Sequence, residues 1–290
     1  MFTLAHLSDW HLAGTPQWSE LASKRGLGLL NWHRHRKHVH RPEVLDATIY
    51  EVRTAGADHI AVTGDLVNFS LTNEYRRARA LLETLASPSD VTVVPGNHDI
   101  YVPGAQSSPA EFWNDYMRGD DGVVRFPFLR RRGAVALIAL STALPTAPFL
   151  ATGHLGDRQL AELAELLDQQ RQAFRIILIH HPPIMPASRY LRRLTDAAAL
   201  LRVLAARGAE LLLHGHDHCR SVIWLDGPDR KIPAVGVPSA SAAARHGDEN
   251  AAGCNIFQID GKPGAWRCEM VARERDAGGV MREIECCKLA

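Results

Sequence analysis

The sequence predicts an α/β fold, and three observations indicate it. Short apolar segments typical of strands alternate with longer segments whose apolar residues recur at helical spacing. Polar blocks rich in Asp and His follow several of the strand segments, and most of them adjoin Gly or Pro. The length of 290 residues and the hydrophobic content of 46% are sufficient for a full core.

Strands and helices alternate through the first three quarters of the chain. The helix over residues 43–54 follows Pro42, which suits a first helical turn, and Val44, Leu45, Ile49 and Val52 form its apolar face. Strands are predicted over residues 2–7, 59–63, 91–94, 134–140, 175–179 and 210–213, and the other helices over 73–85, 157–170 and 195–206.

The helical pattern stops after Cys219. Strands are predicted over 221–225, 231–237, 254–259 and 265–271, with Asp260-Gly261 as a turn signal. We expect this β-rich part, about residues 219–290, to form a second sheet packed on the first. The economical interpretation is one domain over residues 1–290, with a basic and apolar segment inserted at about 14–42.

Five polar blocks stand where predicted strands meet loops. α/β sheets place their ligand sites at these strand ends, so distant blocks can form one site. Glycines within the blocks let the backbone turn sharply and approach a ligand closely. The blocks are Asp9-Trp10-His11, Gly64-Asp65, Gly96-Asn97-His98-Asp99, His180-His181-Pro182-Pro183 and Gly215-His216-Asp217-His218.

The blocks supply carboxylate, amide and imidazole groups, which suit Mn, Fe, Zn or Co. Seven ligands are too many for one tetrahedral ion and suit two divalent ions that share a carboxylate. Paired ions are a means of phosphate-ester chemistry. The candidate ligands are Asp9, His11, Asp65, Asn97, His180, His216 and His218.

Taken in order, these blocks resemble the motifs of the calcineurin-like metallophosphoesterase superfamily, over roughly residues 1–240. The resemblance implies a four-layer α/β/β/α sandwich of two mixed β-sheets flanked by helices, with a dinuclear metal centre. It implies a phosphohydrolase, foremost a phosphodiesterase that uses metal-bound hydroxide for in-line attack at phosphorus.

The resemblance also implies a role for each residue. Asp65 is the shared carboxylate, His98 faces the phosphate to stabilise the oxyanion or protonate the leaving oxygen, and Asp99 orients His98. One implied site holds Asp9, His11, Asp65 and His218, and the other holds Asp65, Asn97, His180 and His216. Structural roles outside the centre are expected for His6, His59, His154, His181, His214 and His246.

The segment from Leu21 to Pro42 is basic and apolar and contains no acidic residue. It can form a solvated cap whose Leu and Trp side chains pack on the core. It can also lie on an anionic membrane surface. Lipid-pathway metallophosphoesterases, including those that cleave UDP-2,3-diacylglucosamine, are similar in combining a dinuclear site with a basic, apolar entrance. Nucleic-acid contact is the least favoured of the three interpretations.

Two further groups of residues are candidates for the rim of the site. Arg189, Arg192 and Arg193 can hold a second phosphate or an anionic head group, or can simply begin an exposed helix. Tyr101, Trp113 and Tyr116 are candidate stacking surfaces for a substrate.

Three hypotheses of function remain open at this point. The first is a phosphodiesterase for a cyclic nucleotide or glycerophosphodiester. The second is a pyrophosphatase for a lipid-linked nucleotide such as UDP-2,3-diacylglucosamine, and the third is a non-catalytic metal-binding scaffold.

The composition and the N-terminus of the chain bear on the partners and the cellular location of the protein. A net charge of +1 favours no nucleic-acid partner, and five unpatterned cysteines indicate reduced thiols. The N-terminus has no signal-peptide pattern, and no apolar run is long enough for a transmembrane helix. We expect a cytoplasmic protein, with peripheral contact at the inner face of the membrane as an alternative, and no feature indicates its oligomeric state.

Overall fold

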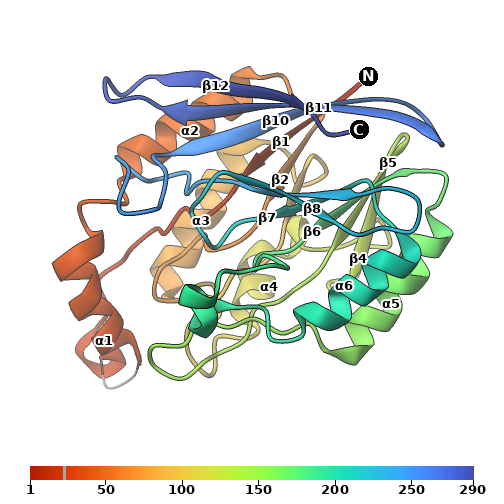
Figure 1. The fold of residues 1–290 in the computed structure, drawn as a ribbon. Helices are drawn as coiled ribbons and strands as arrows, with labels where there is room; N and C mark the ends of the chain where they lie inside the picture. Colours follow the sequence, from red (N-terminus) through yellow and green to blue (C-terminus); the bar gives the residue numbers. More distant parts are fainter. Residues whose placement is uncertain (22–23) are drawn as a thin grey trace.

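The strands of the chain form two sheets, which lie face to face (Figure 1). The computed structural model describes residues 1–21 and 24–290, and each sheet of this described part has six strands. The first sheet has the order β12 (Met281–Lys288), β11 (Ala265–Arg275), β10 (Gly253–Lys262), β1 (Phe2–Leu7), β2 (His59–Val62) and β3 (Val91–Val93). The second has the order β4 (Phe128–Arg132), β5 (Val135–Ala139), β6 (Phe174–Leu178), β7 (Leu211–His214), β9 (Ile232–Gly236) and β8 (Ser221–Leu225).

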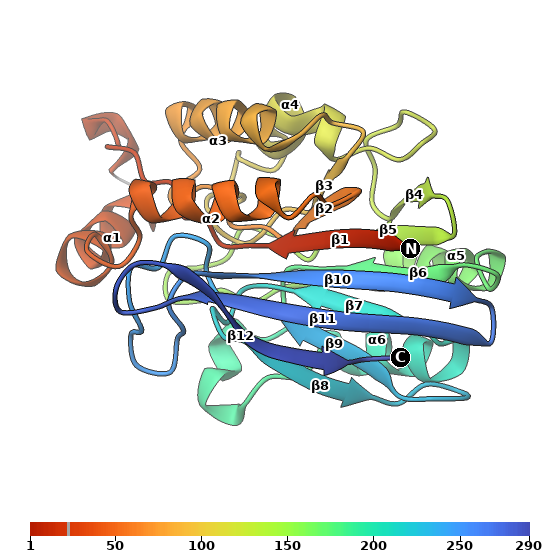
Figure 2. The ribbon, with the colours of Figure 1, turned by 90° about the horizontal axis from the view of Figure 1, so that it is seen from above.

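Helices cover the outer faces of both sheets (Figure 2). The first sheet is covered by α2 (Pro42–Thr54), α3 (Thr72–Leu85) and α4 (Ser108–Trp113), and the second by α5 (Gly156–Gln169) and α6 (Ala197–Arg207). Short 3-10 turns lie at Trp18–Glu20, Asn114–Tyr116 and Ala187–Arg192. The expected four-layer α/β/β/α sandwich is confirmed.

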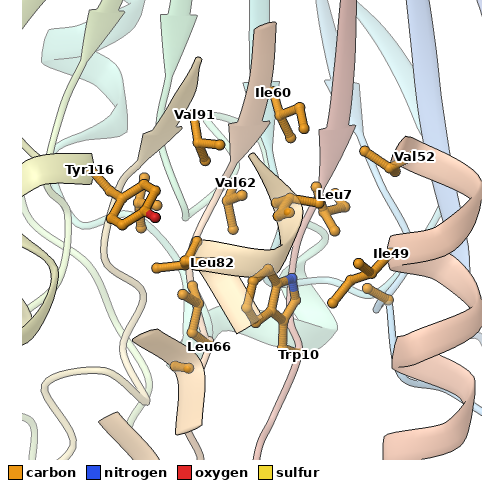
Figure 3. Close-up of a cluster of buried hydrophobic side chains, with 14 of the residues drawn as sticks. Leu7, Trp10, Ile49, Val52, Ile60, Val62, Leu66, Leu82, Val91 and Tyr116 are labelled. Carbon is orange, nitrogen blue, oxygen red and sulfur yellow. The ribbon is translucent and has the colours of Figure 1, made fainter. Parts of the chain in front are cut away.

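The outer core of the first sheet follows from the alternation of side chains along each strand (Figure 3). Leu7, Val62 and Val91 point from neighbouring strands toward the helices. Ile49 of α2 and Leu82 of α3 pack on them. Each large apolar side chain buried in this way contributes about 1.5–3 kcal/mol.

The facing sides of the two sheets form a second apolar layer. Phe257 and Met270 of the first sheet lie in the same buried cluster as Phe174, Ile176 and Leu178 of the second. Strands β6 and β7 are buried on both faces, so their sequences are nearly continuous apolar runs, whereas β11 alternates between buried and exposed residues.

Parallel pairing brings the polar blocks to one end of the molecule. β1 pairs in parallel with β2, β2 with β3, β5 with β6, and β6 with β7. Figure 2 shows β1 pointing toward the end at which α1 (Lys24–Asn31) stands. The loops that follow these strands therefore leave the sheets on the side of α1.

The expectation that the C-terminal strands form their own sheet is wrong. β8 and β9 complete the second sheet, where β9 lies beside β7. β10 instead pairs with the free edge of β1, and Phe2 faces Ile259 across the pair. An alternating pattern shows that a strand exists but not which edge will accept it, so this division could not be read from the sequence.

Two strands and two helices were not predicted. β4 carries three consecutive arginines, and β12 is an edge strand with mostly exposed side chains, so neither has a clean apolar pattern. α4 has only six residues. α1 buries none of its side chains, and a π-helical turn at Trp32–Arg36 follows it.

The inserted segment stands at the end of the molecule beside the strand ends (Figure 1). Residues 22 and 23 of this segment lie outside the described residues. Within Leu21–Pro42, Trp32 is half-buried and meets the buried ring of Phe69, as the capping interpretation expects, whereas Leu27 and Leu30 are each 48% exposed. Within residues 1–21 and 24–290, no helix has the length and apolar character needed to cross a bilayer.

Candidate metal centre

Backbone hydrogen bonds join the loops that carry the polar blocks. The amide of Asp9 donates to the carbonyl of Gly64 over 2.9 Å, and that of His11 donates to Asp65 over 3.0 Å. Gly215 donates to the carbonyl of His180 over 3.1 Å. Blocks far apart in sequence therefore form one continuous surface at the strand ends.

A first cluster brings together Asp9, His11, Asp65 and His218. The Nε2 atoms of His11 and His218 are 2.9 Å apart. Asp9 Oδ1 lies 3.2 Å from His218 Nε2 and 3.7 Å from His11 Nε2. Asp65 Oδ2 lies 4.0 Å from His11 Nε2.

A second cluster shares Asp65 with the first. Asp65 Oδ2 is 3.4 Å from His180 Nε2, which is 3.2 Å from Asn97 Oδ1. His216 Nδ1 also lies 3.2 Å from His180 Nε2. All seven candidate ligands are thus brought together, in the two groups that the resemblance implied.

The donor atoms of the clusters fit metal ions better than they fit one another. Asp9 is fully buried, yet its Oδ1 has no aligned hydrogen-bond donor among the described residues. The close Nε2 atoms of His11 and His218 can share at most one proton between them if both rings are neutral. Buried polar atoms are normally satisfied, so such an arrangement fits the binding of a cation.

Neighbouring groups determine which nitrogen each imidazole presents. His218 Nδ1 donates to Glu249 over 2.9 Å, and His180 Nδ1 donates to the carbonyl of Thr63 over 2.7 Å. His216 Nε2 donates to the carbonyl of Arg192 over 2.9 Å. Each opposite nitrogen therefore faces its cluster, which is the arrangement that partners of metal-binding histidines produce.

Glu249 was missed at the level of sequence. It lies about 30 residues after His218, in a loop with no motif of its own. Its hydrogen bond to His218 lowers the pKa of its carboxyl to about 2, against the opposing effect of burial. Only the fold brings this carboxylate to the centre.

Left-handed backbone recurs at the cluster residues. The φ angles of Asp9, His11, Asp65, His216 and His218 lie between 47° and 71°. L-residues adopt this region rarely and at a cost of about 1–2 kcal/mol each. Strain at five residues of one site indicates that the loops are shaped for function.

Glycine is required where these loops touch. A Cβ on Gly96 would collide with the backbone and carboxylate of Asp65, and one on Gly215 would collide with Ser8 and Asp9. At these two glycines the loops lie in close contact with each other; the close approach of their backbone to a ligand stays a prediction.

The buried charges of the centre interact strongly. Burial opposes protonation of His180, but Asp65 and Asp9 outweigh it and raise the pKa of its imidazole to about 9. Burial likewise opposes protonation of His218, and Asp9 outweighs it and raises that pKa to about 9. His180 and His98 hold the pKa of Asp65 well below its usual value, although burial acts in the other direction.

His98 lies beside the clusters and lines the adjoining cavity. Its amide donates to Asp65 Oδ1 over 2.7 Å, and its Nδ1 donates to the carbonyl of Asn68 over 2.8 Å. Its ring stacks on Tyr101 at 5.2 Å between centroids and meets His11 edge to face at 4.9 Å. The ring is thus held with Nε2 as its free nitrogen.

The expectation that Asp99 orients His98 is wrong. The carboxylate of Asp99 accepts the amides of Val67 over 3.0 Å and Gly96 over 2.8 Å. It is fully buried, and burial together with the charge of Asp65 raises its pKa to about 8. Asp99 follows His98 in the motif, but its carboxylate joins the loops that carry Val67 and Gly96.

Other histidines bond within the fold. His6 and His59 pair with the hydroxyls of Thr63 and Thr92, and His181 pairs with Thr142. Exposed His154 contacts Thr195, His214 bonds the carbonyl of Gly215, and His246 is exposed.

A cavity of about 320 Å³ opens over both clusters. Lys24, Leu27 and Arg36 of the inserted segment form one wall, and the loop around Phe149 forms another. Arg192 completes the rim, so one residue of the predicted second basic cluster reaches the site.

The other rim candidates divide between the cavity and the core. Arg189 instead lies 3.2 Å from Asp217, and Arg193 covers the ring of Tyr190. Tyr101 lines the cavity, as expected. Trp113 and Tyr116 are fully buried in the outer core of the first sheet, so the expectation that they stack on substrate is wrong.

Fold and site together define a metal-dependent phosphoesterase. The calcineurin-like phosphoesterase family matches residues 2–220, and the chain belongs to this family. It is a phosphoric ester hydrolase, and its relatives carry phosphodiesterase names.

The chain is similar to two curated bacterial proteins. It is 29% identical over 279 residues to a cAMP/cGMP dual specificity phosphodiesterase of Mycobacterium tuberculosis, which covers 89% of this chain and 76% of that protein. It is 25% identical to a probable cyclic nucleotide phosphodiesterase of Rhodococcus erythropolis, over 88% of this chain and 79% of that protein.

Among solved structures, a dimetal phosphatase from Danio rerio superposes with a TM-score of 0.69. The sequences are 14% identical, and the match covers 100% of this chain and 98% of the other. A purple acid phosphatase from yellow lupin superposes with a TM-score of 0.62 at 12% identity, over 99% of this chain and 53% of the other. These likenesses concern the fold.

Proposed function

We propose that the protein is a phosphodiesterase with two divalent ions, held by the two clusters that share Asp65. One observation carries the proposal: seven ligand groups converge around a shared carboxylate at the floor of an open cavity. When bound, the ions would lower the pKa of water to supply a nucleophile and would neutralise charge on the phosphoryl oxygens. The ligand set suits Mn, Fe, Zn or Co.

Residues around the cavity suit an anionic ester. Arg36, Arg192 and Lys24 supply positive charge at the walls. Partial burial lowers the pKa of Lys24 to about 8, although the charge of Asp65 opposes this. His98 is held with one free nitrogen toward the space where phosphate would lie, which supports its role at the leaving oxygen or the oxyanion.

A small diester, and within that class a cyclic nucleotide, is the substrate we infer. Tyr101 offers an aromatic face beside His98, where a base can stack. The two similar curated proteins are named for cyclic nucleotides, which supports this choice.

A second candidate substrate is a lipid-linked nucleotide diphosphate. Exposed apolar side chains gather at the cavity, including Leu27 at 48% and Phe149 at 84% exposure. Trp18 and Leu30 of the inserted segment are exposed as well. Such a surface suits acyl chains or peripheral contact with a membrane.

A substrate panel on one Mn-loaded preparation tests both candidates. The panel contains bis-p-nitrophenyl phosphate, p-nitrophenyl phosphate, cyclic AMP and UDP-2,3-diacylglucosamine in mixed micelles. We expect the diesters to be cleaved with the highest kcat/KM. Faster cleavage of the monoester would refute a phosphodiesterase, and a preference for the lipid substrate would select the second candidate.

A further inference from the structure

His40 brings another imidazole to the first cluster, from a part of the chain outside the five blocks. It is the third-last residue of the inserted segment, directly before Arg41 and Pro42 at the start of α2. Its ring centroid lies 4.5 Å from that of His11 and 5.5 Å from that of His218. The side chain is buried, with 5% of its surface exposed.

The ring of His40 is held from the side opposite the cluster. Its Nδ1 lies 2.9 Å from the hydroxyl of Ser241, and the amide of Arg41 donates to the carbonyl of Ser241 over 2.9 Å. Trp32 stacks on the ring with an angle of 15° between the planes. With Nδ1 engaged by Ser241, Nε2 is the nitrogen left to bind an ion.

The spacing of the three rings suits one ion. One ring nitrogen from each of His11, His40 and His218 lies within 4.8 Å of the others. Imidazole nitrogens bind Zn-like ions at about 2.0–2.1 Å, so nitrogens on opposite sides of an ion are about 4 Å apart. His11 and His218, whose Nε2 atoms are 2.9 Å apart, would move slightly apart, and a small adjustment of the three rings would place one nitrogen of each around a single ion.

We propose that His40 is an additional ligand of the first metal site and that an ion bound there also holds the inserted segment in place. The inference rests on the proposed two-ion centre. It goes beyond that centre because His40 belongs to the segment whose residues Lys24, Leu27 and Arg36 form a wall of the cavity. Occupancy of the first site would therefore shape the surface that receives the substrate.

The test compares three variants by metal binding and does not depend on turnover. His40→Ala removes the imidazole, and Ser241→Ala keeps the imidazole but removes its hydrogen bond. His38→Ala is the matched control, because His38 is an exposed histidine of the same segment. Metal content and stepwise Mn²⁺ affinity are measured by titration, and Co²⁺ absorption reports the ligands of each site.

We expect His40→Ala to weaken one of the two binding steps by on the order of 10–100-fold, the scale on which groups around a metal act. Its Co²⁺ spectrum should change, while Ser241→Ala and His38→Ala retain the wild-type spectrum. Hydrogen exchange of residues 24–42 should slow on metal loading in wild type and His38→Ala but not in His40→Ala.

The outcomes separate this inference from the proposed function. If His40→Ala binds two equivalents with wild-type affinity and spectrum, His40 is a packing residue and the inference is overturned, while the two-ion centre stands. If Ser241→Ala weakens binding as much as His40→Ala and both variants keep the wild-type Co²⁺ spectrum, the ring acts by holding the segment and is not a ligand. If wild type holds less than one equivalent, the proposed function itself fails.

Discussion

The imidazole of His98 lies beside the clusters, and one of its ring nitrogens lies within 4.8 Å of a ligand atom of His11 and of Asp65. Its ring is fixed by Asn68 and Tyr101, and its amide bonds Asp65. A ring placed in this way can act on the substrate without contributing to metal affinity.

We therefore expect His98→Ala to lower kcat by about 10²–10⁴-fold while metal content stays at the wild-type level. If His98 protonates the leaving oxygen, the loss is smaller for a p-nitrophenyl ester, whose leaving group departs without a proton, than for cyclic AMP. Steady-state kinetics on both substrates with metal analysis check this. The exposed His154→Ala is the control, and equal losses on both substrates would assign His98 to the oxyanion instead.

At this scale the sequence could identify residues that stand in motifs. All seven candidate ligands were named because each stands in a polar block at the end of a predicted strand, and most of these blocks adjoin Gly or Pro. Glu249 and His40 could not be found, because each reaches the centre only through contacts across the fold. Asp99 stands in a motif, yet its contacts depend on loop geometry that spacing does not specify.

Among the elements, α3 has the most direct link to the site. Its third residue, Glu74, is fully buried and accepts the amides of Phe69 over 2.9 Å and Leu71 over 3.1 Å. It also accepts the amide of Gly14 over 2.7 Å. One carboxylate thus joins the loop after β1 to the loop after β2, although burial raises its pKa to about 7.

Glu74→Ala should lower the free energy of unfolding by about 3 kcal/mol, because it leaves two buried amides and one partly buried amide without their acceptor. Denaturant unfolding of the variant measures this loss. Glu83→Ala on the same helix removes only an exposed pair with Arg79 and should change stability by less than about 1 kcal/mol. Similar losses in the two variants would refute the role assigned to Glu74.

The elements themselves were predictable where their apolar pattern was strong. The bounds predicted for β1 and β8 agree with the structure, and α2, α3 and α5 were placed to within a residue or so. α1 was missed because it has only eight residues and contains two glycines, which disfavour a helix.

For the whole molecule, the buried charges of the centre couple stability to pH. His180 and His218 have pKa values of about 9 in the fold, against an ordinary value of 6.5. Their contribution to stability is therefore fully present below pH 6.5 and is lost as pH rises through about 9. Bound ions need the unprotonated rings, so metal binding strengthens over the same interval.

We expect the melting temperature of chelator-treated protein to fall between pH 6.5 and 9, and the stabilisation by added Mn²⁺ to grow. Thermal denaturation at fixed ionic strength, with and without Mn²⁺, measures both trends. His246→Ala removes an exposed histidine, so this variant should show both pH trends of the wild-type protein. If the stabilisation by Mn²⁺ does not change with pH, the proposed coupling between metal binding and protonation of His180 and His218 is contradicted.

The layers of the molecule followed from the resemblance, but the assignment of C-terminal strands to sheets did not. β8 and β10 have similar apolar patterns, yet they belong to different sheets. Pairing across more than 200 residues depends on which strand edges remain free, and no local pattern contains that information.

The position of β1 between β2 and β10 has a consequence for biosynthesis. A ribosome adds about 5–20 residues per second, so β1 emerges on the order of tens of seconds before β10. During that interval one edge of β1 is unpaired and can pair with other chains, which is the kind of aggregation that chaperones prevent. Asp9 and Asp65 are synthesised long before His218, so the complete set of proposed metal ligands exists only late in synthesis of the chain.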